Sequence, residues 1–238
     1  MRQLPLPMGP IRTLTFDNFL SAANGLAAAH LRSLVGPHGL QAPSSAPVYL
    51  WGPPGSGKTH LLRALAERCQ AAGQGVGWLD GADPQPWVWS PDWALVVVDR
   101  CDTLDAAGQQ AGFTLFVEAA SHGTQVAAAG RVPPVDLPLR DDLRSRLAWG
   151  HVFAMQTPDE AETRAVLRRT ADERDLGLSE EVMAYLLSRF PRDLHHLMWL
   201  LHALDEFGVV HGRRITVPMV RAMIADHGQL SLQHTSTA

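Results

Sequence analysis

The only lysine of this 238-residue chain, Lys58, lies in a glycine-rich octapeptide that could bind phosphate. Residues 52–59 read Gly-Pro-Pro-Gly-Ser-Gly-Lys-Thr and match the pattern G-x-x-x-x-G-K-[ST], whose backbone amides cradle phosphates while the lysine reaches the β- and γ-phosphates and the final hydroxyl holds Mg²⁺. The other nineteen basic residues are arginines. The chain therefore uses lysine only at the position where a narrow, flexible side chain must carry its charge into a loop. We predict that ADP or ATP with Mg²⁺ is held by Gly52, Pro53, Pro54, Gly55, Ser56, Gly57, Lys58, Thr59 and His60.

The elements expected on either side of the octapeptide suit this role. Residues 46–51 read as a short buried strand, and residues 60–70 carry leucines at helical spacing, so a helix opens at the lysine. Residues 94–99 form a continuous apolar run that ends in Asp99, which is typical of a buried parallel strand. P-loop proteins place a Mg²⁺-coordinating acid at such a strand end, so Thr59 and Asp99 are the predicted metal ligands.

Residues that would be needed for hydrolysis are only partly present. Hydrolysing ATPases usually place a second acid directly after the first, and here that residue is Arg100; Asp102, two positions further on, is expected to face elsewhere. We therefore expect the chain alone to hydrolyse ATP only weakly. Arg144 and Arg146 flank a serine in the run Leu-Arg-Ser-Arg-Leu-Ala-Trp-Gly at 143–150. They are either solvated charges at a helix end or, for Arg146, an arginine finger acting in trans on a neighbouring subunit's γ-phosphate.

Alternating strands and helices predict an α/β fold with a parallel sheet covered by helices on both faces. After residue 156 the pattern becomes purely helical and predicts a small lid domain. A capping box at 157–160 starts its first helix, Gly177 ends that helix, and Ser179 caps the second. The remaining expected elements are a helix ending near Leu34, a loop at 36–46, strands at 76–80 and 124–129, a helix at 106–121 with Phe113, Phe116 and Val117 inward, a helix at 193–207 stopped by Gly208, and a last helix from Thr216.

Composition narrows the class of protein. The formal net charge is −4, with 46% hydrophobic and 18% charged residues, as in a soluble globular protein without a global basic field for nucleic acid. Cys69 and Cys101 lack metal or redox spacing, and neither a signal pattern nor a membrane span is evident. A cytoplasmic location is therefore expected.

The octapeptide, the opening Thr-Phe-Asp-Asn-Phe at 15–19 and the run at 143–150 together resemble the AAA+ core of the bacterial replication initiator DnaA, over about residues 12–228. Phe16 and Phe19 are then core residues or a wall of the adenine pocket. The resemblance predicts an AAA+ P-loop NTPase core and divides the chain into an N-terminal arm (1–10), an α/β nucleotide-binding domain (11–156), a helical lid (157–230) and a disordered tail (231–238). We expect no counterpart of DnaA's own N-terminal interaction domain or C-terminal DNA-binding domain.

The arm narrows the resemblance to the Hda family of DnaA inactivators. It resembles the Gln-Leu-x-Leu peptide that docks on the replicative sliding clamp, since a short apolar arm can lie extended in a groove. The family resemblance implies a clamp-tethered regulator, active with ADP bound, that stimulates hydrolysis of DnaA-bound ATP through Arg146. Its implied partners are DnaA and the clamp's β subunit, with DNA and the nucleoid reached only through the clamp. The implied clamp-binding residues are Gln3, Leu4, Pro5, Leu6, Pro7 and Met8.

Departures from the AAA+ pattern leave alternatives open. AAA+ proteins carry a polar sensor residue at the end of the fourth strand, and here that position is Ala129. The arginine that DnaA presents from its lid is also missing, and Arg192 is the one candidate to replace it. Arg192 is therefore either a nucleotide contact or a surface charge. A helicase-loader ATPase, a P-loop kinase and an adaptor without catalytic role remain rivals. Intrinsic ATPase activity, the resident nucleotide, clamp affinity, the role of the second Gln-Leu-x-Leu peptide at 229–232, and the oligomeric state, homo-oligomers included, are not decided by the sequence.

Overall fold

The computed structural model describes residues 14–40, 46–83, 87–190, 194–211 and 215–224. These residues form two compact units that divide between Thr157 and Pro158. No helix among the described residues is long and apolar enough to cross a membrane. The clamp-like arm, Arg192, residues 229–232 and the C-terminal tail lie outside the described residues.

The first unit is built on a five-stranded parallel sheet, which confirms the predicted α/β fold class. The strand order β4-β5-β6-β3-β7 places the strand before the octapeptide between two neighbours. A separate antiparallel pair, β1 and β2, occupies part of the segment expected to be a loop. The strands are β1 (Val35–Gly36), β2 (Gly39–Leu40), β3 (Val48–Trp51), β4 (Gly75–Asp80), β5 (Trp93–Asp99), β6 (Gln125–Gly130) and β7 (His151–Ala154).

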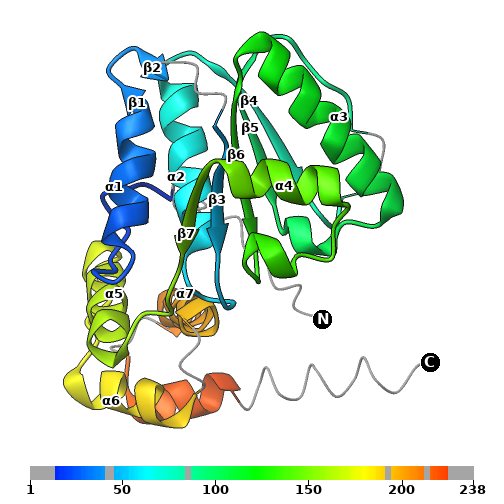
Figure 1. Cartoon of the computed structure of the whole chain (residues 1–238). Coiled ribbons are helices and arrows are strands. Elements are labelled where there is room, and N and C mark those ends of the chain that lie inside the picture. Colours follow the sequence, from blue (N-terminus) through cyan, green and yellow to red (C-terminus); the bar gives the residue numbers. More distant parts are fainter. Residues whose placement is uncertain (1–13, 41–45, 84–86, 191–193, 212–214, 225–238) are drawn as a thin grey trace, which may run out of the picture. The chain divides into compact units, whose positions relative to one another are not determined.

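Helices cover the two faces of this sheet separately, α1 and α2 on one and α3 and α4 on the other (Figure 1). Alternation along β3 explains the two cores, because successive side chains of a strand point to opposite faces. Val48 and Leu50 join the core under α1 and α2, whereas Tyr49 joins the core under α3 and α4. The helices are α1 (Gly25–Leu34), α2 (Lys58–Ala71), α3 (Ala106–His122) and α4 (Asp141–Trp149), with short 3₁₀ turns η1 (Cys101–Thr103) and η2 (Pro134–Asp136).

The sequence analysis missed one strand of this unit and misplaced the inward face of one helix. The sequence analysis did not predict β7, because its four residues are mostly exposed and carry no apolar alternation. In α3 the inward face is shifted from the expected one: Phe116 is buried and Phe113 half-buried, but Val117 is 41% exposed. Small residues, Gly108 and Gly112, complete the buried face of α3, so counting only large apolar residues misplaced it.

The second unit is helical, as predicted, with a core of its own. Its first helix is capped by Asp159 rather than by Thr157: the Asp159 side chain accepts a hydrogen bond from the Glu162 amide, and the Glu162 side chain accepts one from the Asp159 amide. Ser179 caps the second helix as expected. The first helix ends before Gly177, and the third continues through Gly208. The helices are α5 (Glu160–Glu173), α6 (Glu180–Arg189) and α7 (Leu194–His211), followed by helical residues 217–224.

Candidate functional site

The octapeptide forms a tight loop between β3 and α2. Gly55 and Gly57 have φ angles of 77° and 90°, which glycine adopts readily and other residues rarely do. A Cβ on Gly57 would lie 2.6 Å from a ring carbon of Phe19, and a Cβ on Gly52 would collide with the carbonyl oxygen of Met155. The glycines therefore let neighbouring segments close around the loop.

Lys58, the first residue of α2, points its ammonium group back into this loop. The ammonium donates hydrogen bonds to the carbonyl oxygens of Gly52 (2.7 Å) and Pro53 (2.8 Å) and to Oγ of Ser56 (3.1 Å). Burial lowers the pKa of Lys58, while the nearby Asp99 carboxylate acts in the opposite direction. A cation and the N-terminus of a helix thus face the same loop, which is the arrangement that attracts phosphate.

The two predicted metal ligands are brought together across the sheet edge. Thr59 Oγ1 donates a hydrogen bond of 2.6 Å to Asp99 Oδ2, although the residues are 40 positions apart. Asp99 is 3% exposed at the end of β5, and its other oxygen accepts the Arg100 amide at 2.9 Å. A hydroxyl and a carboxylate side by side are oxygen ligands of the type that Mg²⁺ prefers. Among the described residues no cluster of three or more His, Cys, Asp and Glu side chains could hold a metal by itself.

Arg100 and Asp102 are each held by a partner. The Arg100 guanidinium bonds to Asp80, with Nε 3.0 Å from Oδ2, and this contact raises the pKa of Arg100. Contrary to expectation, Asp102 does not face away from the site. Its side chain is only 6% exposed, it accepts a 2.5 Å hydrogen bond from Arg131 Nε, and its charge partly opposes the lowering of the Lys58 pKa that burial causes. An acid therefore lies near the loop, but it is tied to an arginine.

Arg131 was missed by the sequence analysis, which looked for a polar residue at Ala129. Ala129 is fully buried within β6. The carbonyl of Gly130, the last residue of β6, accepts the amide of Gly52 at 3.3 Å, so the residue that follows β6 stands beside the first residue of the loop. The sequence feature that could have identified Arg131 was its position two residues after the predicted strand at 124–129.

Asn24 is a second residue that the sequence analysis missed. It is 2% exposed and joins three segments: its Nδ2 donates to the carbonyls of Ser56 (3.2 Å) and Gln156 (2.8 Å), and its Oδ1 accepts the Gln156 amide at 2.8 Å. No local pattern marks it, because its partners are 32 and 132 positions away. Asn24 thereby fixes the octapeptide against the segment that follows β7.

The opening segment also packs on the loop. His60 contacts the carbonyl of Thr15 through Nε2 at 2.9 Å and meets the Phe19 ring edge-on with a centroid separation of 5.3 Å. Phe16 is 7% exposed and belongs to the core beneath α1 and α2. Phe16 is thus a core residue, while Phe19 and His60 line the outside of the loop.

The structure does not bring Arg146 to the octapeptide. Arg146 lies on α4, where its guanidinium stands 5.2 Å from the centroid of the Phe113 ring of α3. Its neighbour Arg144 pairs with Asp141 at 2.5 Å. Within the described part of the chain, no carboxylate lies within ion-pair distance of Arg146. The two arginines of the run at 143–150 therefore differ, one neutralised within its own helix and the other not.

Family comparisons match both units of the chain. Residues 11–76 match the bacterial DnaA ATPase domain, and residues 159–224 match the lid domain of Hda. This chain is an Hda/DnaA-related AAA+ protein. An uncharacterized protein of Haemophilus influenzae is 29% identical over an alignment of 247 residues. The alignment covers 94% of this AAA+ chain and 98% of that protein.

Solved structures support the same fold for this AAA+ protein. Domain III of the replication initiation protein DnaA from Thermotoga maritima is 20% identical, with a TM-score of 0.74 over 93% of this chain and 98% of that one. DnaA from Aquifex aeolicus bound to AMPPCP is also 20% identical, with a TM-score of 0.67 over 82% of this chain and 65% of that one. A variant of RuvB from Thermotoga maritima gives 16% identity and a TM-score of 0.62, covering 89% and 71% of the two chains.

Replacing Asn24 by Ala should lower the free energy of unfolding by about 1–3 kcal/mol, because buried backbone groups at Ser56 and Gln156 lose their partner. Chemical denaturation of the two proteins measures this difference. Ser33→Ala, an exposed change on the same helix, is the control and should stay within about 0.5 kcal/mol of the parent. Equal stability of Asn24→Ala and the parent would show that Asn24 does not fix the loop.

Proposed function

We propose that this AAA+ protein binds ADP or ATP with Mg²⁺ at the octapeptide. Support comes from the loop geometry: glycines with positive φ, an inward-pointing lysine, and a helix N-terminus on one loop. The similar DnaA structure from Aquifex aeolicus is bound to AMPPCP, a nucleotide analogue. In this proposal residues 52–60 hold the phosphates, and Thr59 and Asp99 hold the metal, which neutralises phosphate charge. Arg192, outside the described residues, is proposed as a further nucleotide contact.

The same geometry supports weak hydrolysis by the chain alone. Activation of water for attack on a γ-phosphate calls for a polar group free to orient it. Arg100 is paired with Asp80, and Asp102 is paired with Arg131. We therefore propose that the nucleotide acts mainly as a ligand of the folded state and that the catalytic contribution of this chain is made to another protein's ATP.

Lys58→Ala should abolish most of the stabilisation that Mg-ADP confers. A ligand that binds only the folded state at 100 times its Kd adds about 2.7 kcal/mol of stability, and the lysine supplies the cation for the phosphates. The melting temperature with and without Mg-ADP measures the effect. The control is Arg63→Ala, which removes a cation of the same helix, stacked on Trp78, and should keep the response. If Mg-ADP leaves the melting temperature of the parent protein unchanged, the proposed nucleotide site is wrong.

We further propose that the protein regulates replication initiation by stimulating hydrolysis of DnaA-bound ATP, which inactivates the initiator. The observation that carries this proposal is Arg146, a guanidinium held over an aromatic ring and not paired with a carboxylate among the described residues. An unpaired guanidinium can be offered across an interface to stabilise charge on a transferring phosphoryl group. The match to the Hda lid supports the assignment to a regulator.

Arg146→Ala should lose stimulation of DnaA while keeping its melting temperature and its response to Mg-ADP. An arginine finger contributes about 10³–10⁵ in rate, so single-turnover hydrolysis of ATP preloaded on DnaA should fall close to the unstimulated level. Arg146→Lys should also largely fail, since a point charge cannot reproduce the planar fork.

Arg144→Ala is the matched control for Arg146, because it removes a neighbouring arginine that is already neutralised by Asp141. Its effect should be small. Full stimulation by Arg146→Ala would remove the finger and favour a nucleotide-dependent adaptor without a catalytic role.

The arm at residues 1–10 is proposed to tether the protein to the sliding clamp, and through it to DNA. Changing Gln3 and Leu4 together to Ala should abolish retention on immobilised clamp, because the arm would lose its polar contact and one apolar anchor. The melting temperature should not change. A variant altered at Gln229 and Leu230 tests the second peptide of similar pattern and should be retained like the parent. Equal retention of the Gln3/Leu4 variant and the parent would contradict the tether.

A further inference from the structure

Two histidines from different elements pack against each other at the edge of the sheet. The ring centroid of His30, on α1, lies 4.3 Å from that of His151, the first residue of β7, and 5.2 Å from that of Phe153. The Nε2 atom of His30 is buried and has no hydrogen-bond partner among the described residues, whereas His151 is exposed. Neither histidine belongs to the proposed nucleotide site or to the proposed action on DnaA.

The surroundings of His30 suit a neutral imidazole ring better than a charged one. In a neutral ring one nitrogen donates and the other accepts, whereas both nitrogens of an imidazolium are donors. Protonated His30 would therefore carry an N–H group at Nε2, where the described residues offer no acceptor, and a positive charge beside His151. Burial accordingly lowers the pKa of His30, and a charge on His151 lowers it further.

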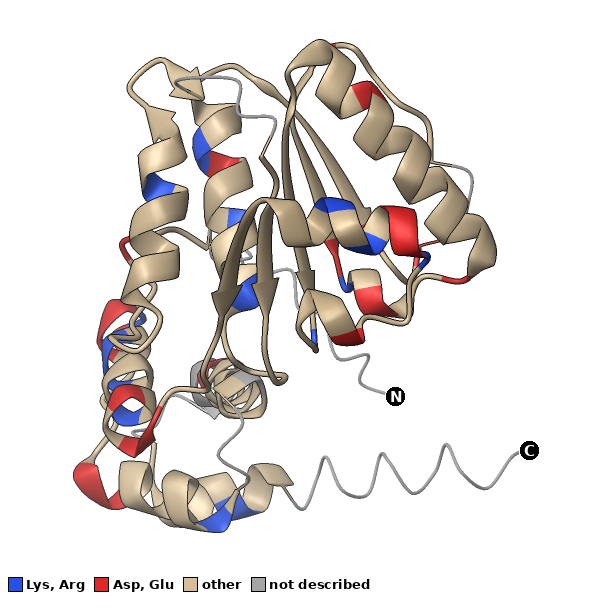
Figure 2. Cartoon of the chain, viewed as in Figure 1, with Lys and Arg blue, Asp and Glu red and all other residues tan. Residues whose placement is uncertain are grey.

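No carboxylate of the described residues contributes to the shift in the pKa of His30. Helix α1 carries one charged side chain, Arg32, which pairs with Asp17 (Figure 2). The only ionisable side chain of β7 is that of His151, and β1 has none. Helix α2, which packs beside α1, carries the ionisable residues Lys58, His60, Arg63, Glu67, Arg68 and Cys69. Of all these groups, only His151 contributes to the shift.

The histidine pair belongs to the same set of contacts as Asn24. Asn24 precedes α1 and bonds to the amide and the carbonyl of Gln156, beyond the carboxyl end of β7, while His30 packs on the amino end of that strand. We call these contacts the α1–β7 joint. Asn24 also bonds to the carbonyl of Ser56 in the octapeptide loop. A change in the α1–β7 joint therefore reaches the loop through a single side chain.

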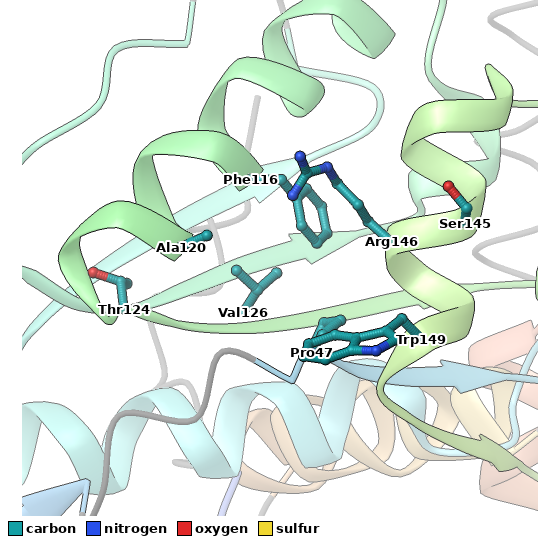
Figure 3. Close-up of a pocket in the computed structure, with 8 residues that line it drawn as sticks. All are labelled: Pro47, Phe116, Ala120, Thr124, Val126, Ser145, Arg146 and Trp149. Carbon is teal, nitrogen blue, oxygen red and sulfur yellow. The ribbon is translucent and has the colours of Figure 1, made fainter.

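Backbone contacts hold the β7 side of the joint in place. The amide of His151 donates to the carbonyl oxygen of Pro47 at 2.8 Å, and a Cβ on Gly150 would collide with the same oxygen. Figure 3 shows the ring of Trp149, at the edge of a cleft that Arg146 also lines, lying against Pro47. The start of β7 cannot move aside without breaking these contacts with the start of β3. Repulsion between two charged histidines would therefore displace His30 and α1.

We propose that the His30–His151 pair makes the octapeptide loop sensitive to pH, because protonation of both rings loosens the α1–β7 joint and with it the hold of Asn24 on Ser56. The folded state lowers the pKa of His30 from its ordinary value of 6.5, so the unfolded chain binds the proton more readily. This contribution to stability is present above that value and is lost as the pH falls below it. The effect on the loop rests on the proposed nucleotide binding, whereas loosening of the joint can be measured on the free protein.

The test compares the parent with His30→Phe and His151→Gln between about pH 7.5 and about pH 5.5. His30→Phe keeps an aromatic ring against Phe153 but cannot be protonated, and His151→Gln removes the second charge from an exposed position. Without nucleotide, the free energy of unfolding should fall less on acidification in both variants than in the parent. The Kd for Mg-ADP should rise several-fold in the parent and less in both variants, and this comparison cancels the titration of the nucleotide itself. His122→Gln, which removes an exposed histidine from α3, is the matched control and should behave like the parent.

An NMR titration of the imidazole protons adds a readout that a purely structural role would not move: His151→Gln should raise the pKa of His30 toward its ordinary value. If His30→Phe does not fold, His151→Gln carries the test. Equal losses of stability and of Mg-ADP affinity on acidification in the parent and both variants would show that the pair is not a pH switch. A pH-dependent stability that leaves the affinity for Mg-ADP unchanged would refute the link to the loop. Failure of the parent to bind Mg-ADP at about pH 7.5 overturns the proposed function instead, and unfolding without nucleotide then decides whether the pair loosens the joint.

Discussion

Backbone hydrogen bonding on both sides of β3 is the constraint on which the candidate site depends. β3 pairs in parallel with β6 on one side and β7 on the other. At its carboxyl end, the Gly52 amide donates to Gly130, and the Met155 amide donates to Trp51 at 2.6 Å. These bonds fix the point at which the loop leaves the sheet, and the close approach of Met155 then excludes any side chain at Gly52. The direction of α2 and the inward turn of its lysine follow from that starting point.

Electrostatic pairing divides the charged residues near the sheet edge into occupied and available groups. Asp80 neutralises Arg100, and Arg131 neutralises Asp102. Among the described residues, the half-buried ammonium of Lys58, whose pKa burial lowers, hydrogen-bonds only to carbonyl and hydroxyl oxygens of the loop. Such a cation gains more from an incoming anion than one already paired, because its charge is not yet offset. This distribution is the basis for proposing that the chain binds a nucleotide more readily than it hydrolyses one.

The first unit presents two chemically different surfaces. One is the carboxyl edge of the sheet, where the loop, Thr59 and Asp99 meet. The other is the face of α3 and α4, where Arg146 and Trp149 border an apolar cleft. The proposed activity needs both, since the first would hold this chain's own ligand and the second would act on a partner. Their separation on one rigid sheet explains why variants of either surface can be tested without disturbing the other.

Local pattern in the sequence determined the octapeptide, the strand that ends in Asp99 and most of the other strands and helices, because each depends on neighbours within one element. Tertiary structure decided the rest. β7 was not predictable, since a short exposed strand exists only through pairing with β3. The roles of Asn24, of Arg131 and of Phe113 beneath Arg146 arise from contacts between segments far apart in the chain. Such contacts are fixed by the packing of the sheet and helices, which no local periodicity records.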